Sequence, residues 1–188
     1  MVMEPLNEKA IIRKLRANDP AALSDLWKLY SEKILNLAFR TLHDRDEAED
    51  VLMDVFVAIP RAAREFRGDS ALGTWIYRLS INECFYHLRK AKRRQTLEEE
   101  NLQLIVERTG IGKKEEFPDL GKILDTALSK LPEDTRGMIW LKDAEGVSIE
   151  ELSRIYEKPV GTLKARLSRG RERMRKFIKE TFYGTLYE

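Results

Sequence analysis

Apolar residues recur every three or four positions along most of this chain, which is the spacing of one face of an α-helix. The first such stripe comprises Leu23, Leu26, Trp27, Tyr30, Ile34, Leu37 and Ala38. Asp19 and Pro20 precede it, and an Asp cap followed by Pro is a common helix start. The pattern predicts a long amphipathic helix that ends near Leu42.

Two more helices are expected in the first half of the chain. The acidic segment 43–50 favours a helix N-terminus, and the buried face that follows is Val51, Leu52, Val55, Phe56 and Ile59. Pro60 predicts a kink or a break, because proline lacks an N–H donor and clashes with the preceding turn. Residues 66–75 contain two glycines and a serine and predict a loop, after which a helix runs to about Arg94.

The second half of the chain begins with an acidic segment that carries Gly110, Gly112 and Pro118 and predicts a linker. A helix then precedes Pro132, and another starts at Pro132 with acids and stops at Gly146. The expected fold class is all-α, with two small helical domains joined by a flexible linker. The expected boundaries are 1–94, an acidic linker 95–120, and a C-terminal domain 121–188.

The C-terminal domain carries a helix-turn-helix pattern. Ser148 and Glu151 fit a capping box, which starts a helix of about eight residues. The segment EKPVG interrupts it, and a second helix begins between Val160 and Thr162. The buried stripe of that helix is Leu163, Leu167, Gly170, Met174 and Phe177. Two short helices joined by about four residues, the second of them basic, are typical of a helix-turn-helix that binds DNA.

The second helix of such a motif lies in the major groove, and its N-terminal residues reach the base edges. Arg and Lys suit guanine O6 and N7, and an Ala methyl suits the thymine methyl. The base or near-phosphate candidates in the first two turns are Thr162, Lys164, Ala165, Arg166, Ser168 and Arg169. The basic side chains farther along the helix are either phosphate contacts or solvated charges: Arg171, Arg173, Arg175 and Lys176.

Charge is strongly segregated although the formal net charge is only +2. Residues 43–60 hold six acids and one base, a balance of −5, and residues 61–94 hold nine bases and three acids, +6. Residues 95–120 hold three bases and seven acids, −4, and residues 158–179 hold nine bases and one acid, +8. Two basic blocks separated by an acidic stretch suggest two contacts with one polyanion.

The first basic block, 74–94, interleaves aromatic and basic residues, a combination that holds single-stranded nucleic acid by stacking and by charge. Trp75 falls at core spacing, so we expect it in the core rather than as a stacking platform. Arg89 is one of the basic side chains that would lie along the phosphate backbone of the nucleic acid. The neighbouring loop would accept a flipped base through Arg67, Gly68, Asp69 and Ser70.

Several functional classes are disfavoured. The single cysteine, Cys84, allows no internal disulfide, agrees with a cytoplasmic location and is expected to be a buried small hydrophobe. No signal peptide or membrane-length apolar run is found, so no membrane insertion is expected. We expect no catalytic residues, no metal site and no cofactor, because no paired nucleophile and base, ligand cluster or phosphate loop stands out.

The two constellations, in this order and with an acidic helix before them, resemble the bacterial RNA polymerase sigma factors of the extracytoplasmic-function (ECF) group. The segments that carry the resemblance are DEAEDVLMDVFVAI, FRG, TWIYRLSINECFYHLRKAKRR and LPEDTRGMIWLKDAEGVSIEELSRIYEKPVGTLKARLSRGRERMR. The resemblance implies a first half that binds core RNA polymerase and melts and reads the −10 element. It implies a second half that reads the −35 element.

The resemblance also implies residue roles. The acidic and apolar helix that docks on a coiled coil of the polymerase's largest subunit would use Asp46, Glu47, Glu49, Asp50, Asp54 and Phe56. The −10 element would be read by the 67–70 loop together with Trp75, Tyr77, Arg78 and Asn82. Glu157 stands where the family usually has a turn glycine, so it is strained if its φ is positive. Met53, Pro60, Ile81, Tyr86 and Ala165 also depart from the family pattern.

The function expected from the sequence is that of an ECF-type sigma factor that directs promoter-specific transcription initiation and has no enzyme activity. Its partners would be core RNA polymerase, promoter DNA as duplex and melted strand, and an anti-sigma factor, which the group commonly has. The alternative is a stand-alone helix-turn-helix regulator whose N-terminal half senses a ligand or dimerises. That regulator would bind duplex DNA without polymerase.

Overall fold

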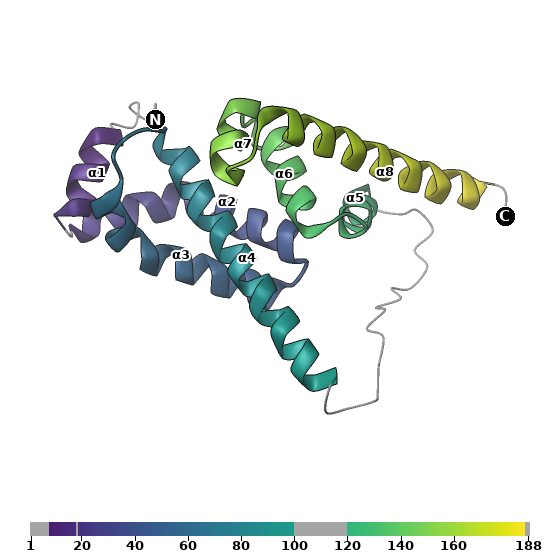
Figure 1. The fold of residues 1–188 in the computed structure, drawn as a ribbon, viewed down its shortest axis with the longest axis horizontal. Helices are drawn as coiled ribbons and strands as arrows, with labels where there is room; N and C mark the ends of the chain where they lie inside the picture. Colours follow the sequence, from purple (N-terminus) through teal and green to yellow (C-terminus); the bar gives the residue numbers. More distant parts are fainter. Residues whose placement is uncertain (1–7, 18, 100–119, 187–188) are drawn as a thin grey trace.

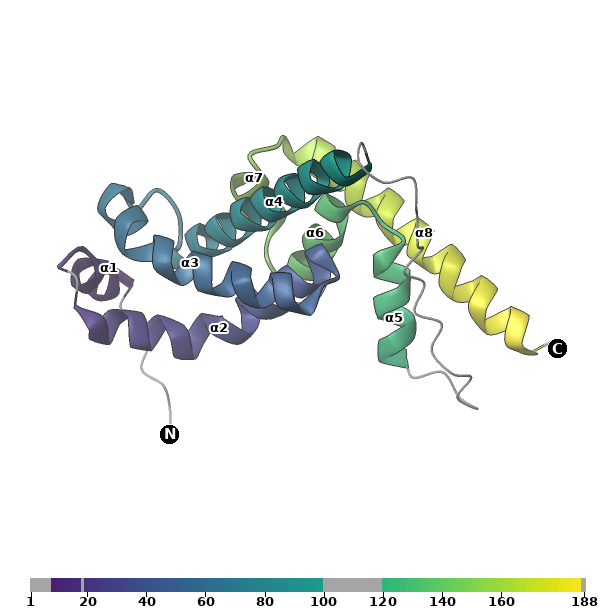
Figure 2. The same cartoon turned by 90° about the horizontal axis from the view of Figure 1, so that it is seen from below.

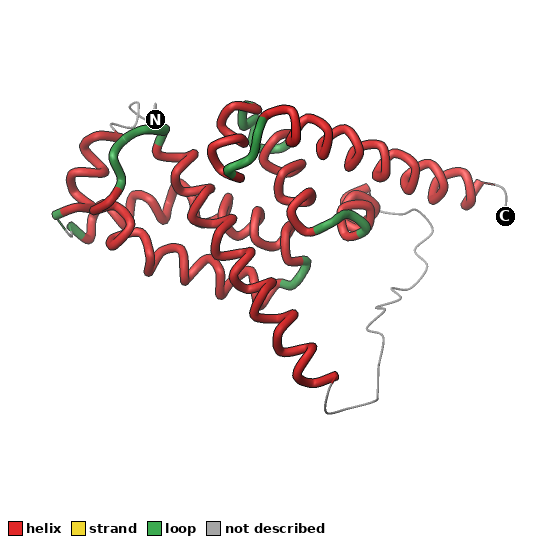
Figure 3. Tube along the Cα trace, in the orientation of Figure 1, coloured by secondary structure: helices red, strands yellow, loops and turns green. Residues whose placement is uncertain are grey.

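The computed structural model describes residues 8–17, 19–99 and 120–186, and these residues form helices and short connections with no strand among them (Figure 3). Their helices are α1 (Glu8–Arg16), α2 (Pro20–Leu42), α3 (Arg45–Glu65), α4 (Leu72–Glu99), α5 (Leu120–Ser129), α6 (Glu133–Asp143), α7 (Ile149–Tyr156) and α8 (Val160–Leu186). The all-α fold class predicted from the sequence is confirmed.

Side-chain caps fix where the first long helices begin. Asp19 caps α2 by accepting a hydrogen bond from the Ala21 N–H at 2.9 Å, and Pro20 occupies the first turn, as predicted. Asp44 caps α3 in the same way, with its carboxylate accepting from the Glu47 N–H at 3.1 Å. The short polar segment between the two helices therefore does more than connect α2 to α3. It also supplies a hydrogen-bond acceptor for a backbone N–H that has no partner within α3.

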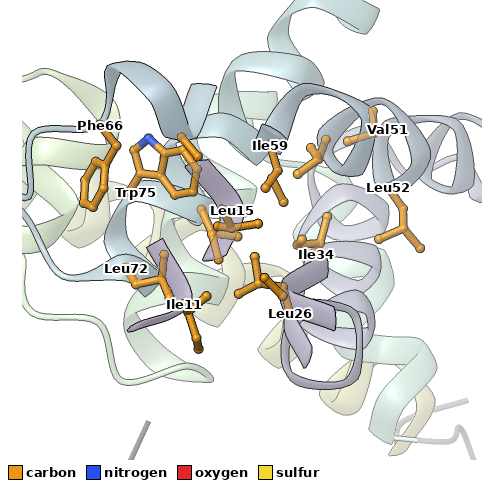
Figure 4. Close-up of a cluster of buried hydrophobic side chains, with 14 of the residues drawn as sticks. Ile11, Leu15, Leu26, Ile34, Val51, Leu52, Ile59, Phe66, Leu72 and Trp75 are labelled. Carbon is orange, nitrogen blue, oxygen red and sulfur yellow. The ribbon is translucent and has the colours of Figure 1, made fainter. Parts of the chain in front are cut away.

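Helices α1 to α4 enclose a first hydrophobic core. Figure 4 shows apolar side chains from all four helices pointing toward one another, among them Leu15, Leu26, Ile59 and Leu72. Each of these four is at most 1% exposed. Burying one such side chain contributes about 1.5–3 kcal/mol, so this core holds the four helices together.

Helices α5 to α8 lie against that first group rather than apart from it (Figures 1 and 2). Helix α6 packs on α2, and α7 packs on α4. A second core is shared by both groups, with Leu37 of α2 and Ile81 of α4 buried among Met138, Leu141 and Leu152. Helix α8 extends away from this contact toward the C-terminus (Figure 1).

Three details differ from the sequence-based predictions. Helix α3 continues through Pro60 to Glu65 without a break, because Ile59 and Ala63 on either side stay buried in the core. Helix α4 continues five residues beyond Arg94 into the predicted linker, whose residues 100–119 lie outside the described part. Trp27 is 41% exposed although it belongs to the apolar stripe of α2.

Candidate nucleic-acid and protein interfaces

Helices α7 and α8 form the predicted helix-turn-helix. Ser148 accepts a hydrogen bond from the Glu151 N–H at 3.1 Å, and Glu151 accepts from the Ser148 N–H at 2.9 Å, which completes the capping box. Glu157 ends α7 with φ 52°, a left-handed conformation that costs a residue with a Cβ about 1–2 kcal/mol. The expected strain at this turn is therefore present, and α8 starts three residues later at Val160.

The first two turns of α8 separate a buried from an exposed face. Leu163 and Leu167 are buried in the second core. Most of the predicted DNA-contacting residues are exposed on the opposite face: Thr162, Lys164, Ala165, Ser168 and Arg169. Arg166 is different, because its guanidinium forms an ion pair with Asp134 in the first turn of α6.

A cleft of about 700 Å³ lies beside the loop between α3 and α4. Most of the residues predicted to read melted DNA line it: Arg67, Asp69, Ser70, Trp75, Arg78 and Asn82. Trp75 is 3% exposed and packs against Phe66 with ring centroids 5.0 Å apart (Figure 4). As its spacing predicts, Trp75 belongs to the core, and it contributes one wall of the cleft.

Helix α1 holds both ends of the loop beside the cleft. Arg16 donates from Nε to the Ala63 carbonyl at 3.2 Å and from its terminal nitrogen to the Phe66 carbonyl, at the C-terminal end of α3. Glu8 accepts from the Leu72 N–H at 3.1 Å, at the first residue of α4. Because both contacts satisfy orphan backbone groups at helix ends, α1 fixes the loop at both anchors. The sequence analysis did not predict this role.

Three of the predicted −10 residues lie elsewhere. Gly68 is in the loop with φ 87°, a conformation that favours glycine, and does not line the cleft. Tyr77 is 6% exposed, and its hydroxyl donates to Glu145 of the connection between α6 and α7 at 2.9 Å. Arg89 is exposed on α4 beyond the cleft. The structure therefore places six of the nine predicted −10 residues around one cleft.

Helix α7 closes one side of the same cleft. Arg154 of α7 and Glu157, the residue that follows α7, also line it. Nearby, the Thr74 hydroxyl of α4 donates to Glu151 of α7 at 3.2 Å, and Arg78 lies 3.9 Å from the Glu157 carboxylate. In this arrangement the helix-turn-helix lies over the surface predicted to read melted DNA.

Helix α3 carries the predicted protein-docking surface. The exposed acids are Asp46, Glu49, Asp50 and Asp54, whereas Glu47 and Phe56 are half-buried. An apolar strip lies beside these acids: Met53 is 55% exposed, Val57 is 75% exposed, and Trp27 packs on Phe56 with ring centroids 4.7 Å apart. The sequence analysis missed this strip, although the spacing 53, 56 and 57 places its α3 members on one helical face.

In the part of the chain that the structure describes, His, Cys, Asp and Glu residues form no group that would hold a metal ion. No helix there has the length and apolar content needed to cross a membrane. Cys84 is completely buried, as predicted, and burial raises the pKa of its thiol to about 12. The thiol therefore stays protonated and packs as a small apolar group.

Comparison with known proteins assigns both halves of the chain to one family. Residues 26–94 match the Sigma-70 region 2 family, and residues 121–174 match Sigma-70 region 4. The RNA polymerase sigma-H factor of Pseudomonas aeruginosa is 32% identical over 182 residues, which cover 92% of this chain and 94% of that protein. The ECF RNA polymerase sigma-E factor of Escherichia coli is 32% identical over 178 residues, covering 90% and 93%.

Solved structures share the fold. The sigma factor RpoE from Bartonella quintana, solved in complex with the anti-sigma factor NepR, matches with a TM-score of 0.67 and 25% identity over 83% of this chain and 96% of that one. CnrH, solved in complex with the cytosolic domain of CnrY, matches with a TM-score of 0.66 and 18% identity over 92% and 97%. With two family regions in order and relatives aligned over nine tenths of its length, the chain belongs to the bacterial RNA polymerase sigma factors of the ECF group.

Proposed function

We propose that the protein brings core RNA polymerase to a two-part promoter, reads the duplex −35 element with α8, and receives an unpaired −10 base in the cleft beside the α3–α4 loop. One observation carries the proposal: an exposed basic recognition helix and a separate cleft of about 700 Å³ occur in the same chain. A ligand-sensing regulator would also use a cleft, but the match of residues 26–94 and 121–174 to Sigma-70 regions 2 and 4 favours the sigma factor over it.

At the −35 element, the exposed face of α8 enters the major groove. Lys164 and Arg169 offer donors to guanine or to phosphate, and the exposed methyl of Ala165 suits a thymine methyl. Arg166 keeps its pair with Asp134, and its side chain remains 30% exposed. Because a guanidinium has five N–H donors, Asp134 leaves Arg166 donors that turn toward DNA.

At the −10 element, the cleft offers both an apolar wall and polar groups. Trp75 and Phe66 supply the wall, while Asp69, Ser70 and Asn82 supply hydrogen-bonding groups for a base edge. Enzymes and readers that handle unpaired bases combine these two features in one pocket. Arg67 and Arg78 line the same cleft and supply positive charge for the phosphates.

The surface of α3 is proposed to dock on the polymerase. Its exposed acids would repel DNA, and the adjoining apolar strip of Trp27, Met53, Phe56 and Val57 is suited to burial against protein. The polymerase performs the chemistry of transcription, so this chain needs no catalytic residue. Because the related sigma factor RpoE is solved in complex with the anti-sigma factor NepR, we also propose that an anti-sigma factor binds this chain.

The test is transcription by core polymerase supplemented with the purified protein on a library of promoter fragments. The expected result is initiation at a distinct subset of fragments that share two short elements. Specific binding to duplex DNA without polymerase, combined with no stimulation of transcripts, would support the stand-alone regulator and overturn the proposal.

Variants separate the two surfaces in the same assay. Asp50→Lys reverses an exposed charge of α3 and should weaken binding to core polymerase by tenfold or more, about 1.4 kcal/mol, without altering promoter preference. Glu180→Lys makes the same change at the distant end of α8 and should leave polymerase binding unchanged. Lys164→Ala should retain polymerase binding and relax discrimination at one position of the −35 element.

A further inference from the structure

His87 of α4 lies between two carboxylates of α3. Its Nδ1 is 2.6 Å from Glu47 Oε2, and its Nε2 is 3.0 Å from Asp54 Oδ2. The imidazole is 5% exposed, whereas the carboxylate side chains are 31% and 53% exposed. Glu47 and Asp54 are seven residues apart, two helical turns, so both lie along the edge of α3 that faces α4.

Counting protons shows which form of the imidazole fits. A neutral imidazole carries one N–H and therefore donates to only one carboxylate, while its other nitrogen directs a lone pair at the second carboxylate. The imidazolium donates from both nitrogens, and both measured separations are hydrogen-bonding distances. With both carboxylates ionised, both hydrogen bonds form only with the positively charged imidazole.

The charges around His87 act in the same direction. Burial lowers its pKa, but the hydrogen bonds and charges of Glu47 and Asp54 outweigh burial, and the net pKa is raised above its ordinary value. Arg94, also on α4, lies 3.3 Å from the other oxygen of Glu47. Glu47, Asp54 and Arg94 are the charged groups that contact the cluster in the described structure, and the Tyr86 ring meets the imidazole edge to face.

We propose that His87, as an imidazolium, is a positioning residue that holds Glu47 and Asp54 in place on the polymerase-docking surface, so that docking weakens as the pH rises. This inference rests on the proposed docking function of α3. With the proton present, each carboxylate has one oxygen fixed by His87, and the exposed Asp54 carboxylate is held ready for a partner. When the imidazolium loses a proton, one carboxylate loses its hydrogen-bond donor and faces the lone pair of an imidazole nitrogen. The docking surface then loses its fixed arrangement.

The direction in which docking changes with pH follows from the raised pKa of His87. The arrangement is complete below the ordinary imidazole value, about 6.5, and is lost as the pH rises through the higher folded-state pKa. The chain has two histidines, and the other, His43, provides an internal comparison. Burial and then the charges of Arg136 and Arg40 lower the pKa of His43.

The first measurement needs no polymerase. In nitrogen NMR of the histidine-labelled free protein, His87 should show two protonated ring nitrogens at neutral pH and should titrate above His43. His43→Asn assigns the signals, and Asn suits the left-handed conformation at that position, φ 61°. A single-tautomer neutral ring at neutral pH would overturn the proposal, whether or not the protein docks on polymerase.

The second measurement is the affinity of the full-length protein for core polymerase between about pH 6 and about pH 9. Wild-type affinity should fall about tenfold across this range, whereas His87→Gln should bind about tenfold more weakly at the acid end and show no fall. His43→Asn should follow the wild-type profile. Identical pH profiles for wild type and His87→Gln would contradict the proposal, while no binding by wild type at any pH would instead contradict the docking function.

A third variant covers the case in which His87→Gln fails to fold. Asp54→Asn changes a half-exposed side chain and leaves the imidazole in place. It removes one of the charges that favour the imidazolium, so the NMR titration of His87 should move to lower pH. An unchanged titration would show that Asp54 does not act on His87 and would overturn the proposal.

Discussion

Gly170 shows how closely α8 approaches α6. A Cβ at this position would lie 2.8 Å from both the Ile139 Cδ1 and the Thr135 Cγ2 atoms. The helix that carries the proposed −35 contacts is therefore positioned by a residue with no side chain, next to the Arg166–Asp134 pair that joins the same two helices. Spacing predicts that Gly170 is on the buried stripe, but only the structure shows why it is glycine.

Gly170→Ala should therefore destabilise the protein by about 1–2 kcal/mol, because overpacking costs about 1–3 kcal/mol and the gain in helix propensity recovers at most about 1. Thermal unfolding followed by circular dichroism measures the change. Gly161→Ala in the same helix is the matched control, since nothing lies within 4 Å of its added Cβ. The control should unfold at the same or a higher temperature; equal loss in both variants would refute the packing explanation.

Residue spacing predicted which residues share a helix face better than it predicted whether an individual side chain is buried or exposed. Glu157 was identified because it replaces a turn glycine, and its φ of 52° confirms the strained conformation. Trp27 belongs to the apolar stripe of α2 but is 41% exposed. Periodicity indicates which residues share a face, and cannot indicate whether another element covers all of that face.

At the scale of elements, α7 depends on Glu151 for more than its cap. The carboxylate accepts from the Ser148 N–H and hydroxyl, and also from the Thr74 hydroxyl of α4. The backbone and side-chain hydrogen bonds from Ser148 lower the pKa of Glu151 despite partial burial. Charge on this one side chain therefore supports both the start of α7 and its contact with α4.

A lowered carboxyl pKa gives stability that is present above the ordinary value, about 4.3, and is lost as the pH falls through the folded-state pKa. Glu151→Gln should remove about 0.5–1 kcal/mol at neutral pH, a range that allows for solvent screening, and should reduce the loss of stability in acid. Urea unfolding at a series of pH values measures both effects. Glu150→Gln, an exposed neighbour, is the control; if it behaves like Glu151→Gln, the effect is not that of the capping box.

Elements were predictable where capping and periodicity agree. Asp19, Pro20, Ser148 and Glu151 mark the starts of α2 and α7 as expected. Pro60 shows where local rules fail, since burial of its neighbours keeps α3 helical at the cost of one backbone hydrogen bond. The resemblance places the proposed docking acids on α3, but the position of His87 behind them depends on how α3 meets α4, which no single-helix pattern reveals.

At the scale of the whole molecule, the main feature is the contact between the two groups of helices. It includes an ion pair between Arg40 and Asp125, and the Arg40 guanidinium lies 4.9 Å from the Trp140 ring centroid. The contact is imperfect, because the Trp140 Nε1 and the Tyr156 hydroxyl are buried without a hydrogen-bond partner among the described residues. Each unsatisfied group costs about 1–3 kcal/mol, which lowers the free energy needed to separate the groups.

Gly137 is the point where this contact is closest. A Cβ there would lie 2.5 Å from Thr41 Oγ1 of α2 and 3.3 Å from Ile81 Cδ1 of α4. Gly137→Ala should therefore separate the two groups while leaving α6 helical, since Ala is the better helix former by about 1 kcal/mol. Small-angle X-ray scattering should show a larger radius of gyration, with Gly161→Ala unchanged.

An unchanged scattering profile for Gly137→Ala, with a lower unfolding temperature, would show that the groups form one inseparable unit. Separation matters for the proposed function because Arg154 of α7 and its C-cap Glu157 line the cleft that would receive a −10 base. The sequence predicted two helical groups and a linker, but it could not predict their contact. Apolar faces are visible in a sequence, whereas the choice of which faces meet is a property of the folded chain.

The three tryptophans occupy three different surfaces. Trp27 lies on the docking strip, Trp75 forms a wall of the cleft, and Trp140 lies under Arg40 where the two groups of helices meet. Replacing any two by phenylalanine would leave a single tryptophan, whose fluorescence can be excited selectively over that of the six tyrosines. The protein thus contains intrinsic reporters for the proposed polymerase binding, base capture and opening, and the order of these proposed events becomes measurable by stopped-flow fluorescence without an added label.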